Sequence, residues 1–320
     1  MNKTSVISSS REHDAPLPQV PAAREREQRR DRVRACQNMA FTLGDSERQA
    51  RGGGAHTNTG SREAGAGAGH VGAGAQIHPD AVVHPSARIG EGVEIGAHSV
   101  VAAGAVIGAN SRLHAGALVG PNVTLGSGCV VHPGALLAGV VAGDDNHIHE
   151  CVTLDGGTKD ADGPTIRIGN NNRVMAYCHV GPHCRIGSGV TIANTVWLPH
   201  HVEVADQVMI GGLCLISPCV RIGRLAMVGF LSDVAASVPP FTMAEGIPCD
   251  VLGLNVVGLR RVGMTASART ALKRCYKLLY RSGLSAFEAT ARIAADVDAS
   301  PERDELLRFV RLPQNGGAAV

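Results

Sequence analysis

Aliphatic residues recur at every sixth position over two long stretches of the chain, with small and polar residues between them. A glycine often follows the aliphatic residue, as after Ile89 and Ile186, and a small residue such as Ser99 stands four places after it. Neither run has a gap. The first run is Val71, Ile77, Val83, Ile89, Ile95, Val101, Ile107, Leu113, Val119, Leu125, Val131 and Leu137, and the second is Ile168, Val174, Val180, Ile186, Ile192, Leu198, Val204, Ile210, Ile216, Ile222, Val228 and Val234.

A period of six fits neither an α-helix, which repeats every 3.6 residues, nor an isolated strand, which alternates. It fits stacked coils of three hexapeptides, in which residues eighteen apart lie over one another at a strand spacing of about 4.8 Å. The aliphatic and small positions then point inward. The sequence therefore predicts a parallel β-helix, and its narrow interior explains why only 3% of the residues are aromatic.

Composition and pattern divide the chain into three segments. Residues 1–70 combine a charged run with a Gly/Ala tract and hold few large apolar side chains, so we expect a disordered tail. Residues 71–240 form the predicted β-helix. Residues 241–320 follow Pro239-Pro240 and carry helix signals, so we expect a helical appendage that covers the open end of the coil stack.

Three helix starts are predicted in this appendage. Thr265 or Ser267 can cap the first helix, Ser285 forms a capping box with Glu288, and Ser300-Pro301 opens the third.

A formal net charge of +2, without a basic stripe or stacking aromatic residues, argues against nucleic-acid binding. The chain has no run of about 18 apolar residues and no secretory signal pattern, so we expect a cytoplasmic protein without an integral membrane segment. The nine cysteines include no CxxC pair, which indicates reduced thiols. Four of them fall at the inward small position and are interpreted as packing residues: Cys129, Cys178, Cys184 and Cys214.

Four histidines lie within residues 179–201. His183 and His201 occupy the fourth place of hexapeptides one coil apart, and Cys219 has the same place one coil further, so these side chains should form a ladder on an outer edge. His179 and His200 lie beside it. The group suits either a general base for a sugar hydroxyl or a metal site completed by Cys219 or another subunit, and spacing does not choose between them. The earlier histidines are interpreted as turn residues without function: His78, His84, His114 and His132.

Several segments resemble the acyl carrier protein-dependent UDP-N-acetylglucosamine O-acyltransferases that begin lipid A synthesis. They are NNRVMAYCHVGPHCRIG (171–187), MIGG (209–212), GIPCDVLGLNVVGLRR (246–261) and YKLLYRSG (276–283). The likeness spans residues 77–295, and its C-terminal part separates this family from sugar N-acyltransferases and γ-type carbonic anhydrases. It implies a left-handed coil, a homotrimer with active sites in the clefts between subunits, and no metal or bound cofactor. It also implies transfer of a 3-hydroxyacyl group from acyl carrier protein to the glucosamine 3-hydroxyl of a UDP-sugar.

At individual positions the chain matches the family pattern in some places and differs from it in others. His179 and His201 match family histidines, but Pro182 stands at the position of the family's histidine base, and Ser217-Pro218 replace a His-Gln pair. The family pattern IHRGT reads Leu154-Asp155-Gly156-Gly157-Thr158 here.

The substrate-binding positions are partly kept. The resemblance implies nucleotide contacts for Asn255 and Arg261, whereas an acidic residue and a second arginine are replaced by Val257 and Val262. It implies that the backbone N–H of Gly212 faces the acyl group. Phe230 replaces a small residue at the end of the acyl groove, and its size favours a shorter chain.

Three hypotheses remain open from the sequence. In the first, His183 replaces the lost base, with His179 and His201 beside it and an altered acceptor allowed. In the second, the protein is a catalytically silent relative that binds sugar nucleotide or acyl carrier protein, or regulates the active enzyme. In the third, the trimer cleft holds a metal ion as in the carbonic anhydrase relatives.

Overall fold

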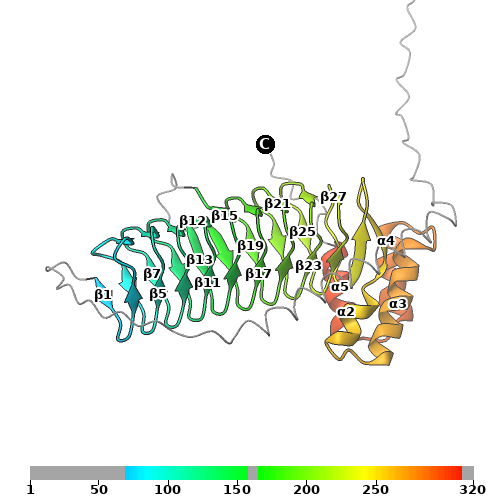
Figure 1. Ribbon diagram of the computed structural model, residues 1–320. Helices are drawn as coiled ribbons and strands as arrows, with labels where there is room; N and C mark the ends of the chain where they lie inside the picture. The colour runs from blue at the N-terminus through cyan, green and yellow to red at the C-terminus, as the bar shows by residue number, and fades with distance from the viewer. Residues whose placement is uncertain (1–68, 158–164, 312–320) are drawn as a thin grey trace, which may run out of the picture. The chain divides into compact units, whose positions relative to one another are not determined.

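The computed structural model describes residues 69–157 and 165–311. Most of these residues form a left-handed parallel β-helix, a triangular prism whose three faces are three sheets of very short strands, followed by α-helices at its C-terminal end (Figure 1). The fold expected from the six-residue period is thus confirmed.

Successive strands of the chain go to the three sheets in turn, so each sheet takes every third strand. Sheet A contains β1 (His70–Val71), β4 (Arg88–Ile89), β7 (Val106–Ile107), β10 (Thr124–Leu125), β13 (Val140–Ala142), β16 (Ile166–Ile168), β19 (Arg185–Ile186), β22 (Glu203–Val204) and β25 (Arg221–Ile222). Sheet B begins with β2 (Gln76–Ile77), β5 (Glu94–Ile95), β8 (Arg112–Leu113), β11 (Val130–Val131), β14 (His147–Ile148) and β17 (Arg173–Val174), and continues with β20 (Thr191–Ile192), β23 (Met209–Ile210), β26 (Met227–Val228), β28 (Thr242–Glu245) and β29 (Asp250–Leu254). Sheet C contains β3 (Val82–Val83), β6 (Val100–Val101), β9 (Leu118–Val119), β12 (Leu136–Ala138), β15 (Thr153–Asp155), β18 (His179–Val180), β21 (Trp197–Leu198), β24 (Leu215–Ile216) and β27 (Asp233–Val234).

The second residue of nearly every two-residue strand points into the prism, and the first points outward. Val180 and Leu198 pair in register on sheet C, and both are fully buried. The four cysteines predicted to pack inward are buried as well: Cys129, Cys178, Cys184 and Cys214. Stacking therefore builds one continuous aliphatic core from residues that a single coil could not shield.

The coil stack continues through the stretch in which the sequence period is lost. Ala142, Ile148 and Leu154 take the inward positions there, and they pair with Leu125, Val131 and Leu137 across coils that are one residue short of eighteen. The next coil is longer, because Ile168 pairs with Ala142, which lies 26 residues earlier in the chain. The one residue missing between Leu137 and Ala142 and the longer coil that ends at Ile168, and not a break in the solenoid, explain the missing period.

Beyond the last complete coil, the chain adds to sheet B before it becomes helical. β28 pairs in parallel with β26, and β29 returns antiparallel to β28. The helices are α2 (Val256–Arg261), α3 (Ala266–Tyr280), α4 (Ala286–Asp296) and α5 (Pro301–Arg311).

The helices share a second apolar core, which includes Phe241, Leu259, Leu272 and Ile293. An ion pair between Arg224 and Glu305, at 2.7 Å, ties α5 to the last coils.

The expected helix starts agree with the structure. The Thr265 hydroxyl accepts a hydrogen bond from the backbone N–H of Ala268, and Ser285 and Glu288 form the predicted capping box. The Ser300 hydroxyl accepts a hydrogen bond from the Arg303 backbone N–H at the start of α5. Within residues 69–157 and 165–311, none of the helices has the length and apolar character needed to cross a membrane.

Candidate active site

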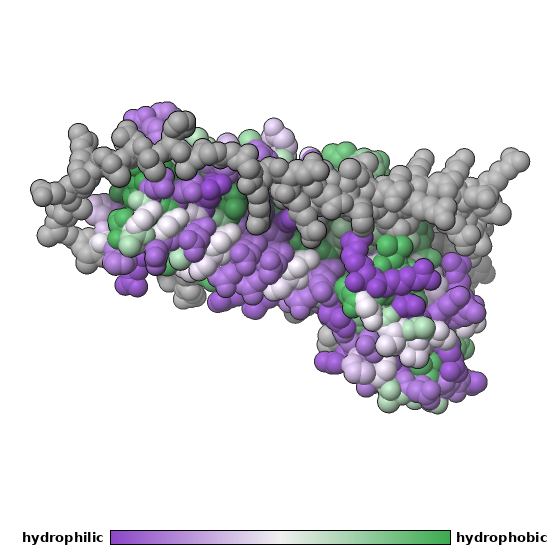
Figure 2. Space-filling view, turned by 60° about the horizontal axis from the view of Figure 1, so that its bottom comes forward, coloured by the Kyte–Doolittle hydropathy of each residue, from purple (hydrophilic) through white to green (hydrophobic). Residues whose placement is uncertain are grey.

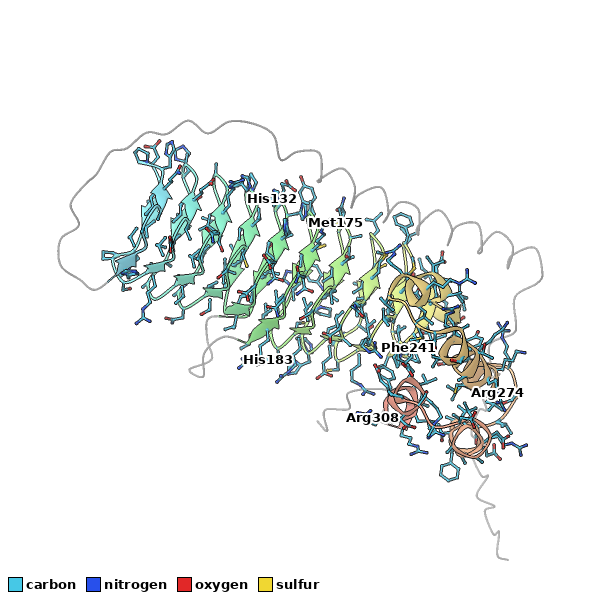
Figure 3. All side chains as sticks on the ribbon, turned by 90° about the horizontal axis from the view of Figure 1, so that it is seen from below. His132, Met175, His183, Phe241, Arg274 and Arg308 are labelled. Carbon is cyan, nitrogen blue, oxygen red and sulfur yellow. The ribbon has the colours of Figure 1, made fainter. Side chains whose placement is uncertain are left out.

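Two edges of the prism matter for the site. The turns that lead from sheet C to sheet A form what we call the CA edge, which carries His183, His201 and Cys219. The turns that lead from sheet B to sheet C form the BC edge, which carries His132, Gly212 and Phe230. In Figure 3, His183 lies on one side of the prism, and His132 and Met175 lie on the other.

The CA edge stacks two imidazoles. His183 and His201 both adopt left-handed backbone conformations, with φ of 61° and 58°, because each holds the same place in a tight turn. Their ring centroids are 4.5 Å apart and their planes differ by 27°. Cys219 has the same backbone conformation one coil further, and its N–H donates a hydrogen bond to the carbonyl of His200.

The neighbours of His201 favour its neutral form. Its Nδ1 lies 3.1 Å from Nδ1 of His200. Burial lowers the pKa of His201 below its usual value, and the nearby His183 and His200 imidazoles lower it further. At neutral pH this group therefore has a lone pair available to accept a hydrogen bond or a proton.

His179 lies on the outer face of sheet C, on strand β18. Its ring stacks on the indole of Trp197 with a centroid distance of 4.0 Å. Burial lowers the pKa of His179, and the negative charge of Asp155 partly opposes this effect. Trp197 and Asp155 were not singled out from the sequence, although reading the position before or after each inward aliphatic residue would have placed both around His179.

Pro182 lies in the turn between His179 and His183. Its carbonyl accepts the backbone N–H of His201 at 3.0 Å, so it continues the ladder between coils. The pyrrolidine ring has no basic nitrogen in a peptide. The basic groups at this turn are therefore the two histidines that flank it.

Gly212 and Phe230 stack on the BC edge, across sheet C from the imidazoles. A Cβ atom on Gly212 would lie 3.7 Å from the Phe230 ring and 3.2 Å from the carbonyl oxygen of Asn194, which is closer than usual contact. Phe230 is 45% exposed. Within one chain, the proposed acyl-binding residues and the proposed base thus lie on different edges.

Asn255 and Arg261 lie in the helical part. The Asn255 side chain is buried, donates to the Leu225 carbonyl at 2.9 Å and accepts the N–H of Gly258 at 3.0 Å, so it caps α2. Arg261, by contrast, ends α2 with an exposed side chain. The structure gives Asn255 a structural role and leaves Arg261 on the surface.

A groove of about 790 Å³ lies elsewhere, between the outer face of sheet A and α5. Arg185, Arg221 and Phe309 are among the residues that line it, and His183 and His201 are not. The imidazoles instead lie on a convex edge. Such an edge needs a second surface to enclose a substrate.

The outer face of sheet C provides an apolar surface between the two edges. Its large apolar residues lie on four successive coils and, beyond Thr153 and His179, on two more. Sheet A presents mostly charged residues at the equivalent positions of its later coils, such as Arg167, Arg185 and Glu203. The apolar residues, which we call the sheet C row, are Val82, Val100, Leu118, Leu136, Trp197 and Leu215, each at least 36% exposed. Figure 2 shows one face of the prism, where hydrophilic side chains predominate in oblique bands and strongly hydrophobic side chains form separate patches.

No three potential ligands of the CA edge gather into a metal site within the described residues. Within the described residues, the one group of three potential ligands consists of His132, His149 and Glu150, and it lies on the BC edge. A metal ion held by the CA-edge histidines would need ligands from another subunit.

Known families match both parts of the chain. Residues 69–103, 104–139 and 165–200 match the bacterial transferase hexapeptide family (six repeats), and residues 238–318 match domain 2 of UDP-N-acetylglucosamine O-acyltransferase. An acyl-[acyl-carrier-protein]–UDP-N-acetylglucosamine O-acyltransferase from Thiobacillus denitrificans is 44% identical over 255 residues, which cover 76% of this chain and 98% of that protein. The chain belongs to this O-acyltransferase family.

Solved structures agree with this assignment. A UDP-N-acetylglucosamine acyltransferase from Bacteroides fragilis superposes with a TM-score of 0.72 at 31% identity, covering 75% of this chain and 99% of that one. The enzyme from Moraxella catarrhalis gives a TM-score of 0.71 at 31% identity, covering 75% and 98%. The family expected from the sequence segments is therefore confirmed, both in the prism and in the helical part.

Proposed function

We propose that this protein transfers a 3-hydroxyacyl group from acyl carrier protein to the 3-hydroxyl of UDP-N-acetylglucosamine, the first step of lipid A synthesis, with His183 as the general base. Family membership supports the reaction, because the relatives are named for this transfer. The stacked His183–His201 pair beside Pro182 carries the choice of base.

In the proposed step, His183 removes the proton of the acceptor hydroxyl while the hydroxyl oxygen attacks the thioester carbonyl. The C–O bond forms, the C–S bond breaks, and the proton passes to the departing thiol of the carrier. His201 assists by being neutral, since a charged neighbour would oppose the imidazolium that forms on His183. His179, stacked on Trp197, positions the acceptor from the face of sheet C.

A homotrimer completes this site. The sheet C row offers apolar surface for contact with another copy, and exposed apolar patches of this kind mark interaction sites. Contact there would bring the BC edge of one subunit, with Gly212 and Phe230, toward the CA edge of its neighbour. The two halves of the site would then face one cleft.

A cytoplasmic location belongs to the same proposal. All eight cysteines in the described residues are free thiols, as expected in a reducing compartment.

The test is an acyl-transfer assay with UDP-N-acetylglucosamine and hydroxyacyl carrier proteins of several chain lengths. We expect His183→Ala to lower kcat about 10²- to 10⁴-fold, the usual contribution of general-base catalysis. His84→Ala, which removes an exposed turn histidine from an earlier coil, serves as the matched control and should leave kcat unchanged.

Replacement of Pro182 distinguishes an active enzyme with His183 as its base from a catalytically silent relative. If the wild type shows no turnover and Pro182→His creates it, the protein is a binding or regulatory relative. Robust wild-type turnover that survives His183→Ala would show that another group is the base.

A further inference from the structure

Three imidazoles stack on successive coils of the BC edge. His114, His132 and His149 each follow the inward residue of a sheet B strand, so the repeat places them over one another. The His114 and His132 centroids are 4.9 Å apart, and those of His132 and His149 are 4.6 Å apart with planes that differ by 4°. His132 is labelled in Figure 3, on the side of the prism away from His183.

Glu150 reaches both of the last two rings. One of its carboxylate oxygens lies 3.1 Å from Nδ1 of His132, and the other lies 3.7 Å from Nδ1 of His149. The ligand atoms of the three residues all lie within 4.8 Å of one another. Metal–ligand bonds of about 2.0 Å in a tetrahedral site put neighbouring ligand atoms about 3.3 Å apart, so the two measured separations are of the right size.

The group is partly open, and Glu150 is held as a carboxylate. The side chains of His132 and His149 are 21% and 15% exposed, whereas Glu150 is 47% exposed, so the open side faces solvent. A hydrogen bond from its own backbone N–H lowers the pKa of Glu150, and the two histidines lower it further. Two imidazoles and one carboxylate are all groups that can act as ligands of a transition-metal ion.

We propose that His132, His149 and Glu150 bind one divalent transition-metal ion of the zinc class in each subunit. Two imidazole nitrogens and one carboxylate oxygen suit Zn²⁺, Co²⁺ or Ni²⁺ and disfavour Mg²⁺ and Ca²⁺, which prefer oxygen ligands. Binding requires the two parallel rings to tilt toward each other about χ2, a torsion with a broad minimum. Water fills the remaining coordination position.

The position indicates a structural role. His132 belongs to one coil and His149 with Glu150 to the next, at the step where Val131 pairs with Ile148 and the coil is one residue short. An ion shared between them would fasten these coils together. Within one chain this site lies on a different edge from the proposed base, and its test measures metal uptake and not turnover, so its existence does not depend on the proposed reaction.

The test uses the full-length protein, freed of metal with a chelator and titrated by calorimetry with Zn²⁺, Co²⁺ and Mg²⁺. We expect one Zn²⁺ or Co²⁺ per chain, visible absorption bands typical of four-coordinate Co²⁺, a higher Tm with Zn²⁺, and no uptake of Mg²⁺. Loss of a residue that merely supports a ligand weakens metal binding 10- to 100-fold, so His149→Ala and Glu150→Gln should weaken it by at least about 100-fold. Both variants should also lose the Zn²⁺-dependent rise in Tm.

Two controls separate this site from others. His84→Ala removes an exposed turn histidine and should bind Zn²⁺ as the wild type does. His183→Ala shows whether metal uptake depends on the imidazoles of the CA edge. Circular dichroism of each metal-free variant shows whether it is folded. The proposal is overturned if the wild type takes up no Zn²⁺ or Co²⁺, or if uptake survives Glu150→Gln and His149→Ala but is lost in His183→Ala.

Discussion

Replacement of Asn146 by alanine should destabilise the prism far more than its small size suggests. Asn146 is fully buried at a position where most coils have a small or aliphatic residue. Its Nδ2 donates to the carbonyls of Gly143 and Gly169, both at 2.8 Å. Its Oδ1 accepts from the backbone N–H of Asn172 at 3.1 Å and from Nδ2 of Asn172 at 2.9 Å. The side chain thus bonds four polar groups of the shortened coil and the next one, of which the two on Asn172 are fully buried.

The magnitude follows from these four bonds. The carbonyl of Gly143 keeps a bond from Cys129 Sγ, so Asn146→Ala leaves three partners without a hydrogen bond. At about 1 kcal/mol each, the free energy of unfolding should fall by about 3 kcal/mol. Ser99→Ala is the matched control, because the buried Ser99 hydroxyl donates one bond, to the carbonyl of His114 at 2.9 Å. We expect that change to cost about 1 kcal/mol.

Urea unfolding followed by circular dichroism measures both variants at equal protein concentration. The midpoint should fall while the m-value stays constant, since the buried area hardly changes. A cost for Asn146→Ala of less than about 1 kcal/mol, or one no larger than that of Ser99→Ala, would refute the reasoning that this polar ladder holds the short coil.

Three further predictions concern the proposed site. Phe230→Gly should shift the preferred acyl chain longer, each added methylene gaining about 0.8 kcal/mol or roughly fourfold in kcat/KM, and an unchanged chain-length profile would contradict a role for the ring. Histidine NMR titration should place the pKa of His201 below 6.5 in the wild type and higher in His200→Ala, because a like charge is removed while burial remains; a fall would contradict the assigned cause. Leu118→Glu in the sheet C row should lower the assembly mass measured by light scattering, whereas Arg88→Glu on sheet A should not; equal masses for both would exclude this face as the interface.

Much of the fold was predictable because it repeats. A strict period of six determines which residues point inward, so the burial of Cys178 and Cys184 and the stacking of His183 on His201 followed from the sequence. The helix caps at Thr265 and Ser285 were predictable too, since capping is decided within four residues. The division into tail, prism and helical appendage stays a prediction, and residues 1–68 of the expected tail lie outside the described residues.

The shortened coils could not be predicted in the same way. There one residue is missing after Leu137, so the later inward positions shift by one, and the small side chain of Ala142 weakens the aliphatic signal. A pattern search sees only a loss of period, whereas the backbone ladder continues. The group formed by His132, His149 and Glu150 was missed for the same reason, because His149 belongs to that irregular stretch.

The sequence by itself determined the solenoid and the identity of the imidazole ladder, because both depend on spacing along the chain. It also indicated the family, because several segments resemble those of its members. Tertiary structure decided which edge of the prism each candidate residue occupies. It separated His201 from Phe230 across sheet C, used Asn255 as the cap of α2, and brought Glu150 between two stacked imidazoles. These relations depend on how neighbouring coils and helices pack, and a one-residue change in coil length is enough to alter them.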